Sequence, residues 1–407
     1  MSSKRLFYVV DDRIEIVETF VAMLSSAGHD ASGSTSVHHA LQDIIRLKPD
    51  CVLVDLMMPE LDGIAFCQEI RRHPGLDRTK FVVVSGKPYD FDRRQAAAVG
   101  AAGYITKPVR LDFVQHLEKM LADRAELRFW GVRGTLPVPG SRALRYGGNT
   151  SCVTLSLEND RLFILDGGTG IKELSNHLLA RKGRISAKIF ITHPHWDHIN
   201  ALPYFTPFYM QGNEFEVLGA VHGELTMADL FGAQMSGVYF PVTTREFAAR
   251  ISFRDLREQE FEIDGVAVRT MLLCHPGICL GYRFTVQGKS VCYVTDQELF
   301  PPSRPEHDPQ YVDRLTDFVR DADVLITDTT YSDEEYRSKI GWGHSCISAA
   351  ATLADRAGVK ELCLFHHDPD QTDADIDRKL ASTQELLREL HSPTICRAPA
   401  EGDTILL

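Results

Sequence analysis

The chain has no long hydrophobic run and no segment that resembles a leader. None of its apolar stretches approaches the roughly 20 residues that a membrane-spanning helix needs, so we expect no membrane contact. The N-terminus runs from Met1 straight into acidic residues without a cleavage pattern, which predicts a cytoplasmic protein without a signal peptide. A hydrophobic content of 44% and a charged content of 25% are ordinary for globular proteins.

Paired cysteines are also missing. Nine cysteines, an odd number, lie singly and mostly among apolar neighbours: Cys51, Cys67, Cys152, Cys274, Cys279, Cys292, Cys346, Cys363 and Cys396. We expect them to be reduced core residues. A metal or redox role for Cys274 and Cys279 stays open, although their spacing fits no zinc ribbon.

Positive charge is scarce in most of the chain. Residues 126–407 hold 28 basic and 39 acidic residues, and therefore eleven of the twelve net negative charges. Proteins that bind nucleic acid usually present a basic stripe to the phosphate backbone. Long nucleic acids are therefore expected to be poor partners.

No flexible linker interrupts the chain. Its 407 residues exceed what one hydrophobic core ordinarily supports, and we expect two domains, at residues 1–125 and 126–407. Helical spacing of apolar residues predicts a helix at 111–125, and the strand predicted at 127–132 follows almost at once. Because no Gly/Ser-rich or Pro-rich stretch lies between them, the domains are expected to be joined stiffly.

In the first domain, apolar strands alternate with amphipathic segments. Strand-like runs at 6–10, 51–54, 81–84 and 103–105 predict a parallel α/β sheet. Such sheets bind ligands beyond the carboxyl ends of their strands. Polar residues follow these ends: Asp11 and Asp12 after the first strand, Asp55 after the next, and Ser85 and Lys107 after the later ones.

In this order, these residues resemble the receiver domain of two-component response regulators, over about residues 4–125. The resemblance implies a flavodoxin-like fold with a five-stranded parallel sheet and a sensor histidine kinase as phosphodonor. It also implies roles for six residues: Asp55 as phosphoacceptor, Asp11 and Asp12 as magnesium ligands, Ser85 and Lys107 as phosphoryl contacts, and Tyr104 as the switch aromatic. Clustered carboxylates repel unless a hard divalent cation joins them, which agrees with a magnesium site. A receiver fold that no longer takes phosphate is the alternative.

The most informative stretch of the second domain is Thr-His-Pro-His-Trp-Asp-His at 192–198. It places four donors, His193, His195, Asp197 and His198, directly after the apolar strand predicted at 189–191. Imidazoles with a carboxylate are the ligand set of zinc and its neighbours. Three more candidates, His275, Asp296 and His366, also follow strand-like runs. This repetition favours a metal site over a histidine-rich surface loop.

With a strand-rich pattern that indicates two sheets between outer helices, these residues resemble the metallo-β-lactamase fold over about residues 128–407. Within that fold they resemble the phosphodiesterase branch, which includes tRNase Z and related cyclic-phosphate hydrolases. The resemblance implies a four-layer αβ/βα sandwich with two divalent metal ions, expected to be zinc, with manganese or iron as alternatives. It assigns His193, His195 and His275 to one ion, Asp197, His198 and His366 to the other, and Asp296 as the bridge.

Two further stretches belong to this resemblance. Asp166-Gly-Gly-Thr-Gly170 looks like the glycine turn of the fold, or else is a simple tight turn. Gly341-Trp-Gly-His-Ser345 resembles the segment whose His faces the scissile phosphate; its alternative is a capping Ser with a bystander His. The expected catalytic residues are therefore Asp197 and His344. Members that process tRNA carry an extended, glycine-rich arm that grips the RNA, and the sequence shows no such insertion. Residues 203–250 are instead aromatic and compact, and either wall a pocket for a small substrate or form plain core.

The leading hypothesis is a response regulator whose output is a dinuclear-metal hydrolase. Its substrate is expected to be a small nucleotide-like phosphodiester, and phosphorylation of Asp55 is expected to regulate it. Fold alone does not decide the chemistry, so hydrolysis of a thioester or lactam remains open. So does a di-iron redox or oxygen-sensing module, although di-iron members usually put a carboxylate at the position of His195. A homodimer through the receiver face that holds Tyr104 is also open.

Overall fold

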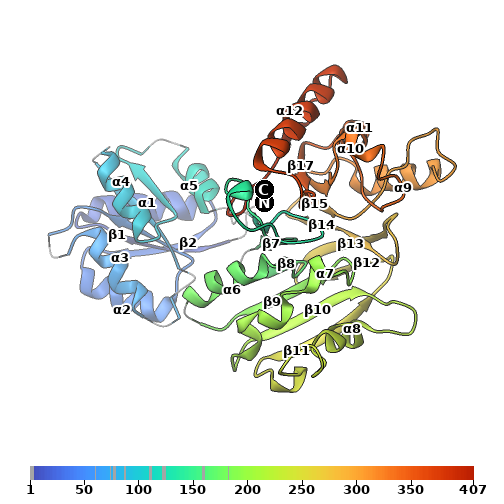
Figure 1. Cartoon of the computed structure of the whole chain (residues 1–407). Helices are drawn as coiled ribbons and strands as arrows, with labels where there is room; N and C mark the ends of the chain where they lie inside the picture. The colour runs from blue at the N-terminus through green and yellow to red at the C-terminus, as the bar shows by residue number, and fades with distance from the viewer. Residues whose placement is uncertain are drawn as a thin grey trace. The chain divides into compact units, whose positions relative to one another are not determined.

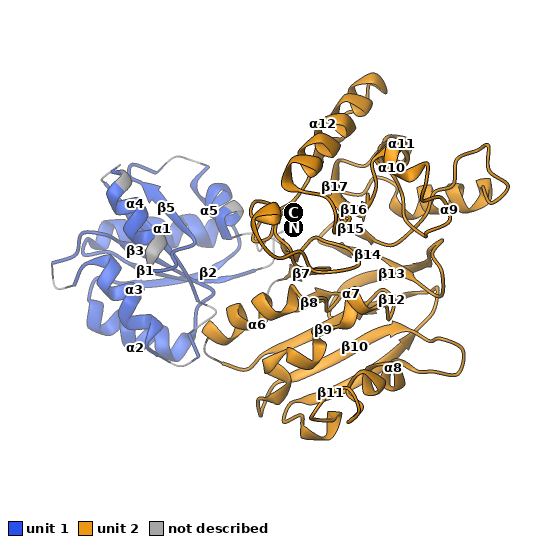
Figure 2. Ribbon diagram, in the orientation of Figure 1, with its two compact units in different colours: residues 1–123 blue, residues 124–407 orange. Residues whose placement is uncertain are grey.

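The computed structural model describes residues 4–59, 61–73, 75–76, 79–86, 89–109, 112–121, 125–157, 161–181 and 183–407. The chain forms two compact units, residues 1–123 and 124–407, which Figure 2 colours separately. The helix expected at 111–125 is α5 (Phe113–Leu121). Its expected ends, residue 111 and residues 122–124, lie outside the described residues.

The smaller unit is a parallel sheet with the strand order β2-β1-β3-β4-β5 (Figure 1). Its strands are β1 (Leu6–Val10), β2 (Asp30–Ser34), β3 (Cys51–Asp55), β4 (Lys80–Ser85) and β5 (Gly103–Thr106). α1 (Ile14–Ser26) and α5 pack on one face, and α2 (Val37–Leu47), α3 (Gly63–Arg71) and α4 (Asp90–Ala98) pack on the other. This arrangement confirms the flavodoxin-like fold with five strands.

One strand of this sheet has no hydrophobic signature in the sequence. β1, β3 and β4 are apolar because helices cover both of their faces. The edge strand β2 reads Asp-Ala-Ser-Gly-Ser and is only partly buried. A Cβ at Gly33 would lie 2.5 Å from the carbonyl oxygen of Val9, so the close approach of β2 to β1 requires glycine there.

The larger unit contains two seven-stranded sheets, in the orders β11-β10-β9-β8-β7-β6-β19 and β12-β13-β14-β15-β16-β17-β18. The first comprises β6 (Glu126–Gly131), β7 (Cys152–Ser156), β8 (Leu162–Leu165), β9 (Ser186–Ile191), β10 (Glu214–Ala220), β11 (Arg250–Leu256) and β19 (Thr404–Leu406). The second comprises β12 (Glu260–Ile263), β13 (Val266–Leu272), β14 (Leu280–Val286), β15 (Lys289–Val294), β16 (Val324–Asp328), β17 (Glu361–Phe365) and β18 (Ile395–Arg397).

The helices of this unit are α6 (Ile171–Ala180), α7 (Trp196–Ile199), α8 (Met227–Gln234), α9 (Pro309–Val319), α10 (Asp333–Tyr336), α11 (Ile347–Ala357) and α12 (Asp373–Glu389). The two sheets pack face to face through aromatic rings: Phe284 lies 5.8 Å from Phe163 and 5.0 Å from Phe190, between ring centroids. α6 and α8 pack on the outer face of the first sheet, and α9, α11 and α12 on that of the second (Figure 1). The expected four-layer αβ/βα sandwich is therefore confirmed.

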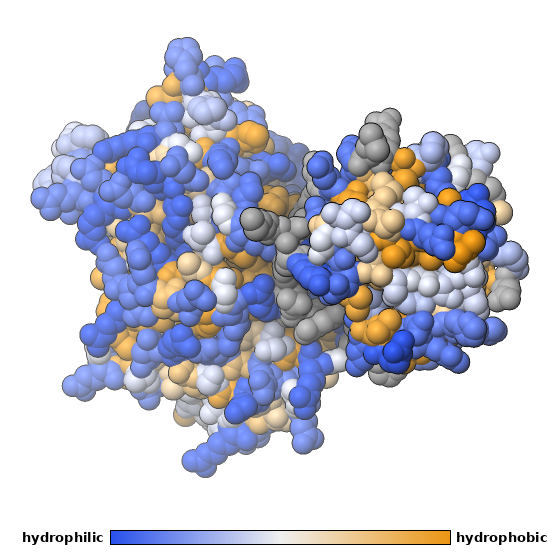
Figure 3. Space-filling model, turned by 180° about the vertical axis from the view of Figure 1, so that it is seen from behind, coloured by the Kyte–Doolittle hydropathy of each residue, from blue (hydrophilic) through white to orange (hydrophobic). Residues whose placement is uncertain are grey.

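The surface of the larger unit is mainly polar on the side shown in Figure 3. Hydrophilic residues predominate on this face, and hydrophobic ones are scattered among them. In the described parts of the chain, no helix is long and apolar enough to cross a membrane.

Candidate functional site

The seven predicted metal ligands lie in segments that directly follow strands of the sandwich. His193 and His195 follow β9, and Asp197 and His198 belong to the short helix α7. His275, Asp296 and His366 follow β13, β15 and β17. The structure brings these seven side chains into two adjoining groups of donors.

The first group is formed by His193, His195, His275 and Asp296. The Nδ1 atom of His195 lies 2.9 Å from His193 Nε2 and 3.1 Å from His275 Nε2. The Oδ2 atom of Asp296 lies 3.6 Å from His193 Nε2 and 3.8 Å from His275 Nε2. Three imidazole nitrogens and one carboxylate oxygen therefore converge on one point.

The second group is formed by Asp197, His198, His366 and the same Asp296. The Oδ1 atom of Asp296 lies 3.2 Å from His198 Nε2 and 3.1 Å from His366 Nε2. Asp197 Oδ2 lies 3.2 Å and 3.0 Å from the same two nitrogens. Asp296 thus turns one carboxylate oxygen toward each group.

These donors fit divalent metal ions. Nitrogens bound to one tetrahedral zinc at about 2.0–2.1 Å stand about 3.3 Å apart, close to the separations in the first group. The Nε2 atom of His198 is buried and has no hydrogen-bond partner among the described residues. A buried polar atom without a partner is costly, and an ion in the second group would satisfy it.

Most of these histidines are oriented by a contact at the nitrogen that faces away from the donors. His275 Nδ1 lies 2.9 Å from the carbonyl oxygen of Gly343, and His366 Nδ1 lies 3.0 Å from Thr330 Oγ1. His198 Nδ1 lies 2.8 Å from Asp166 Oδ2. Such contacts fix the ring and present Nε2 to a metal.

The Asp166 carboxylate lies behind the second group of donors and accepts several hydrogen bonds there. Asp166 is fully buried, and its carboxylate also accepts hydrogen bonds from Thr192 N (2.8 Å) and from Tyr293 Oη (2.9 Å). The sequence predicted a glycine turn at 166–170 but assigned Asp166 no role. Asp166, Asp296 and His366 have positive φ values of 61°, 52° and 61°. Backbone strain of this kind is often concentrated at functional sites.

Burial and neighbouring charges set the protonation of the donors. Burial lowers the pKa of His193 well below its usual value and also lowers the pKa of His195 and His275. Neutral imidazole is the form that binds metal. Burial also acts to lower the pKa of His198, but three surrounding carboxylates outweigh it and raise this pKa well above its usual value.

Backbone groups that the sequence did not indicate also shape the site. Thr135 N donates a hydrogen bond of 2.7 Å to Asp197 Oδ2. A Cβ at Gly134 would lie 2.2 Å from His366 Cε1, so only glycine lets this segment approach the site so closely. Contacts of this kind, between segments that are remote in the sequence, cannot be predicted from residue types alone.

His344 lies beside both donor groups. Its ring centroid is 5.3 Å from that of His275 and 5.0 Å from that of His366. Its Nδ1 atom lies 2.7 Å from Asp328 Oδ2 at the end of β16. Burial acts to lower the pKa of His344, but the Asp328 carboxylate outweighs it and raises this pKa to about 9. The Asp328 carboxylate thus favours the protonated form of His344.

The sequence also singled out the aromatic stretch at 203–250 and Cys279, which differ in their exposure. In the aromatic stretch at 203–250, Phe205 and Phe208 are fully buried core, whereas 59% of Tyr204 and 77% of Tyr239 are exposed. Cys279 Sγ lies 3.6 Å from His193 Nδ1, the nitrogen that points away from the donors, and burial raises its thiol pKa well above the usual value. Cys279 therefore packs in the core behind His193 and is not among the two groups of converging donors.

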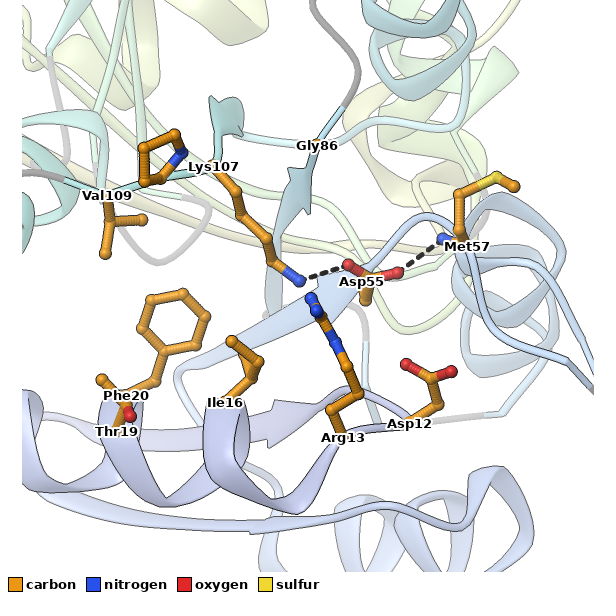
Figure 4. A pocket seen from close by; sticks show the side chains of 11 residues that line it. Asp12, Arg13, Ile16, Thr19, Phe20, Asp55, Met57, Gly86, Lys107 and Val109 are labelled. Carbon is orange, nitrogen blue, oxygen red and sulfur yellow. Dashed lines mark hydrogen bonds and ion pairs between the residues drawn. The ribbon is translucent and has the colours of Figure 1, made fainter.

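The receiver-like unit has a second polar site at the carboxyl edge of its sheet, in a cavity of about 830 Å³ (Figure 4). Lys107 Nζ lies 2.5 Å from both Asp55 Oδ1 and Asp11 Oδ2. The other oxygen of Asp55 accepts a hydrogen bond of 2.6 Å from Met57 N. Asp12 lines the same cavity, so the three carboxylates and the lysine that were predicted do come together.

Three predicted receiver residues lie outside the lining of this cavity, and one of them, Asp11, contacts it through Lys107. Ser85 is buried at the end of β4, next to Gly86, which does line it. Tyr104 is buried on β5, and the Arg93 guanidinium lies 5.3 Å from the centre of its ring. Arg13, which the sequence did not single out, reaches from the start of α1 toward Asp55 (Figure 4).

The two folds and their sites define the class of the chain: a receiver domain followed by a metallo-β-lactamase-fold hydrolase. The model of the response regulator receiver domain matches residues 7–118, and that of the beta-lactamase superfamily domain matches residues 162–367. The second match covers half of the chain, and the chain belongs to the β-lactamase superfamily.

Named relatives divide between the two domains. The chain is 30% identical over 119 residues to the alkaline phosphatase synthesis transcriptional regulatory protein PhoP of Bacillus subtilis, covering 29% of this chain but only 49% of PhoP. It is 28% identical over 269 residues to ribonuclease Z of Lactococcus lactis subsp. cremoris, covering 54% and 83%. The metallo-β-lactamase fold protein YhfI of Bacillus subtilis superimposes with a TM-score of 0.52 at 17% identity, covering 70% and 100%. This last likeness bears on the fold.

Proposed function

We propose that the protein is a response regulator whose output domain hydrolyses a phosphodiester bond in a small nucleotide-like molecule. The observation that carries this proposal is the position of His344, held by Asp328 beside both donor groups. An imidazolium there suits an anionic phosphate better than the neutral carbonyl of a thioester or lactam. The similarity to ribonuclease Z supports the same chemistry.

Each part of the site has a separate task in this proposal. Two divalent cations, held by the seven donors, would polarise the phosphoryl group and make water a competent nucleophile near neutral pH. Asp197 and Asp296 hold negative charge against those cations, and Thr135 N fixes the Asp197 carboxylate. His344 donates a hydrogen bond to a phosphate oxygen, or its proton to the leaving oxygen.

Exposed aromatic rings beside the donors favour a nucleotide-like substrate. Trp196 lies between the donors His195 and Asp197, and 69% of it is exposed. Trp342 lies two residues before His344 and is 61% exposed. Aromatic side chains in such positions can stack on the base of a nucleotide, whichever base it is. The acidic balance of the domain disfavours a long nucleic acid as substrate.

The proposed regulation begins at Asp55. A kinase would transfer a phosphoryl group to this carboxylate, with magnesium held by Asp11 and Asp12 and with Lys107 offsetting the added charge. Asp12, Asp55 and Lys107 line one cavity and Lys107 also contacts Asp11, which supports this assignment. Ser85 and Tyr104 are proposed to report the phosphoryl group to the rest of the receiver.

The test compares turnover of bis(p-nitrophenyl) phosphate, a thioester and a lactam, by wild type and by His344→Ala. We expect the phosphodiester to be the best substrate and the variant to lose about 100-fold or more of that activity. His391→Ala, an exposed histidine after α12, is the matched control and should keep full activity. Preference for the thioester or lactam, with little effect of His344→Ala, would contradict the proposal.

Metal analysis distinguishes the proposed hydrolase from the di-iron redox alternative. Protein purified without added metal should contain close to two divalent ions per chain. Iron with visible absorption, together with no turnover of any of the three substrates, would favour the di-iron sensor instead.

A further inference from the structure

The larger unit contains a second cavity, of about 690 Å³, within the size range of small-molecule sites. Its walls come from α9, α10, α11 and the segment 299–309. Side chains such as Leu299, Phe300, Val312, Ile340 and Leu353 make it mostly apolar. Neither His344 nor any of the seven donors is among its described lining residues.

A buried carboxylate connects this cavity to the catalytic site. Glu298 is only 1% exposed, and its Oε1 accepts hydrogen bonds from Tyr336 Oη (2.7 Å) and Gly341 N (2.8 Å). Its Oε2 accepts one from Gly343 N (2.8 Å), directly before His344. Tyr336 lines the cavity. One carboxylate therefore joins the cavity wall to the segment that carries His344.

The same residue reaches the metal donors through its backbone. Glu298 N donates a hydrogen bond of 2.8 Å to the carbonyl oxygen of Cys274, next to His275. Glu298 also lies two residues after Asp296. A displacement of Tyr336 would therefore be transmitted to three parts of the catalytic site: the segment that carries His344, His275 and Asp296.

The rim of the cavity carries two arginines, Arg337 and Arg356, and two aspartates, Asp313 and Asp333. The Arg356 guanidinium is paired with Asp313, and Asp333 Oδ1 accepts hydrogen bonds from Ser348 N (3.2 Å) and Oγ (2.6 Å). Within the described structure, the exposed guanidinium of Arg337 has no ion pair and no side-chain hydrogen bond. Arg337 is therefore the rim cation that remains available to an anionic group, whereas hydrogen bonds from Ser348 hold the Asp333 carboxylate.

We propose that this cavity is an effector site for a small amphipathic anion, with its apolar body in the cavity and its charged group on Arg337. Binding shifts Tyr336 and, through Glu298, the segment 341–344. A ligand changes the rate only if it binds one position of this segment more tightly than another. The effect on rate rests on the proposed hydrolase function, but the binding does not.

The probe is dodecanoate, used below the concentration at which it forms micelles. Binding is measured by calorimetry, and the emission of Trp342 is followed in a Trp196→Phe background, in which the remaining Trp130 is buried. We expect saturable binding with a change in Trp342 emission, because Glu298 holds the glycines on both sides of this residue. Turnover of bis(p-nitrophenyl) phosphate by wild type should change over the same concentrations.

Three variants locate the site. Ala349→Phe fills the cavity from α11 and should remove binding, and Arg337→Gln should weaken it by about tenfold or more. Arg314→Gln, on α9 but not lining the cavity, should bind as wild type does. Dodecanol, which lacks the charge, should bind wild type and Arg337→Gln equally.

Each of the other possible outcomes contradicts one stated part of the proposal. Equal binding of dodecanoate by wild type and Ala349→Phe would place the ligand elsewhere. Loss of binding in Ala349→Phe without any ligand effect on Trp342 emission in the parent would overturn the connection through Glu298. Absence of turnover in all samples, with binding and emission changes intact, would count against the proposed hydrolase function and leave the site standing.

Discussion

The Nδ1 atom of His344 lies 2.7 Å from the Oδ2 atom of Asp328, although the two residues are sixteen positions apart in the chain. The Asp328 carboxylate is fully buried, and its Oδ1 also accepts hydrogen bonds from Thr330 N and Thr330 Oγ1. It is therefore held in place by the backbone beside it. This rigid carboxylate keeps the imidazole turned toward the donors and favours its charged form.

The first prediction follows from this pair. Asp328→Asn removes the charge that raises the pKa of His344, so the imidazole should lose its proton at lower pH. If the protonated form is active, the alkaline limb of the pH–rate profile should move to lower pH, and activity at pH 8 should fall by about 10- to 100-fold. His344→Ala should lack this limb. An unchanged alkaline limb in Asp328→Asn would show that His344 does not act as a cation.

The second prediction concerns Asp296. Each of its carboxylate oxygens faces a different donor group, so Asp296→Ala should lower the metal content from two ions per chain toward one or none. Elemental analysis after gel filtration measures this directly. Asp308→Ala, which removes the exposed N-cap of α9, is the matched control and should keep two ions. Two ions retained in Asp296→Ala would overturn its assignment as the shared ligand.

The strand-end pattern predicted most of this site because each donor follows an apolar run. Asp328 ends Val-Leu-Ile-Thr-Asp, the same signal, and could have been found by the same reasoning. Glu298 and Thr135 N could not, since their roles depend on backbone groups brought together from remote segments. The sequence order of such segments says nothing about their distance in space.

Two elements, β2 and α12, lack the hydrophobic pattern from which helices and strands are predicted. β2 is polar because it is an edge strand, and α12 is polar over most of its surface. The longest helix in the described structure, α12 buries only four side chains, Ile376, Lys379, Thr383 and Leu387. A capping box between Thr372 and Asp375 and the acidic residues of the first turn were the local signals of its start.

The third prediction is that Asp55 takes a phosphoryl group from a small phosphodonor in the presence of Mg²⁺. Asp55→Asn should abolish the label, detected by mass spectrometry or radiolabel. Asp62→Asn, which changes the exposed N-cap of α3, should be labelled as wild type is. Label that persists in Asp55→Asn would identify another acceptor, whereas an unlabelled wild type would indicate a receiver that no longer takes phosphate.

The fourth prediction concerns Lys379, whose amino group is buried and donates hydrogen bonds to Thr329 O (2.5 Å) and Thr330 O (3.2 Å). Burial lowers its pKa to about 7. The unfolded chain keeps the usual value of about 10.4, so between these two pH values it binds one proton more than the folded protein. The free energy of unfolding should therefore rise with pH across this range, by up to about 1.4 kcal/mol per unit.

Lys379→Met removes this contribution. Urea unfolding of both proteins at pH 7 to 9.5, at one fixed metal concentration, isolates it as a difference between the two curves. Wild type should gain stability relative to the variant as the pH rises. Parallel curves would mean that Lys379 is charged throughout this range.

The last prediction is that phosphorylation of Asp55 changes the rate of the hydrolase. Only residues 122–125 separate α5 from β6, which leaves little chain to absorb a change in the receiver. Phosphorylation adds charge and hydrogen-bond acceptors at the end of β3, and receivers respond by repacking the face that holds Tyr104 and the last helix. A coupling of about 1 to 3 kcal/mol would change activity or substrate affinity roughly 5- to 150-fold.

Two routes can carry this coupling: a change within one chain, or pairing of two phosphorylated receivers. Turnover and sedimentation of wild type and Asp55→Asn, each with and without phosphodonor, distinguish them. A rate change at constant mass supports the first route, and a rate change with doubled mass supports the second. Asp55→Asn should show neither, because it lacks the acceptor. Equal rates and equal masses in all four samples would leave the receiver as a docking module without control over the hydrolase.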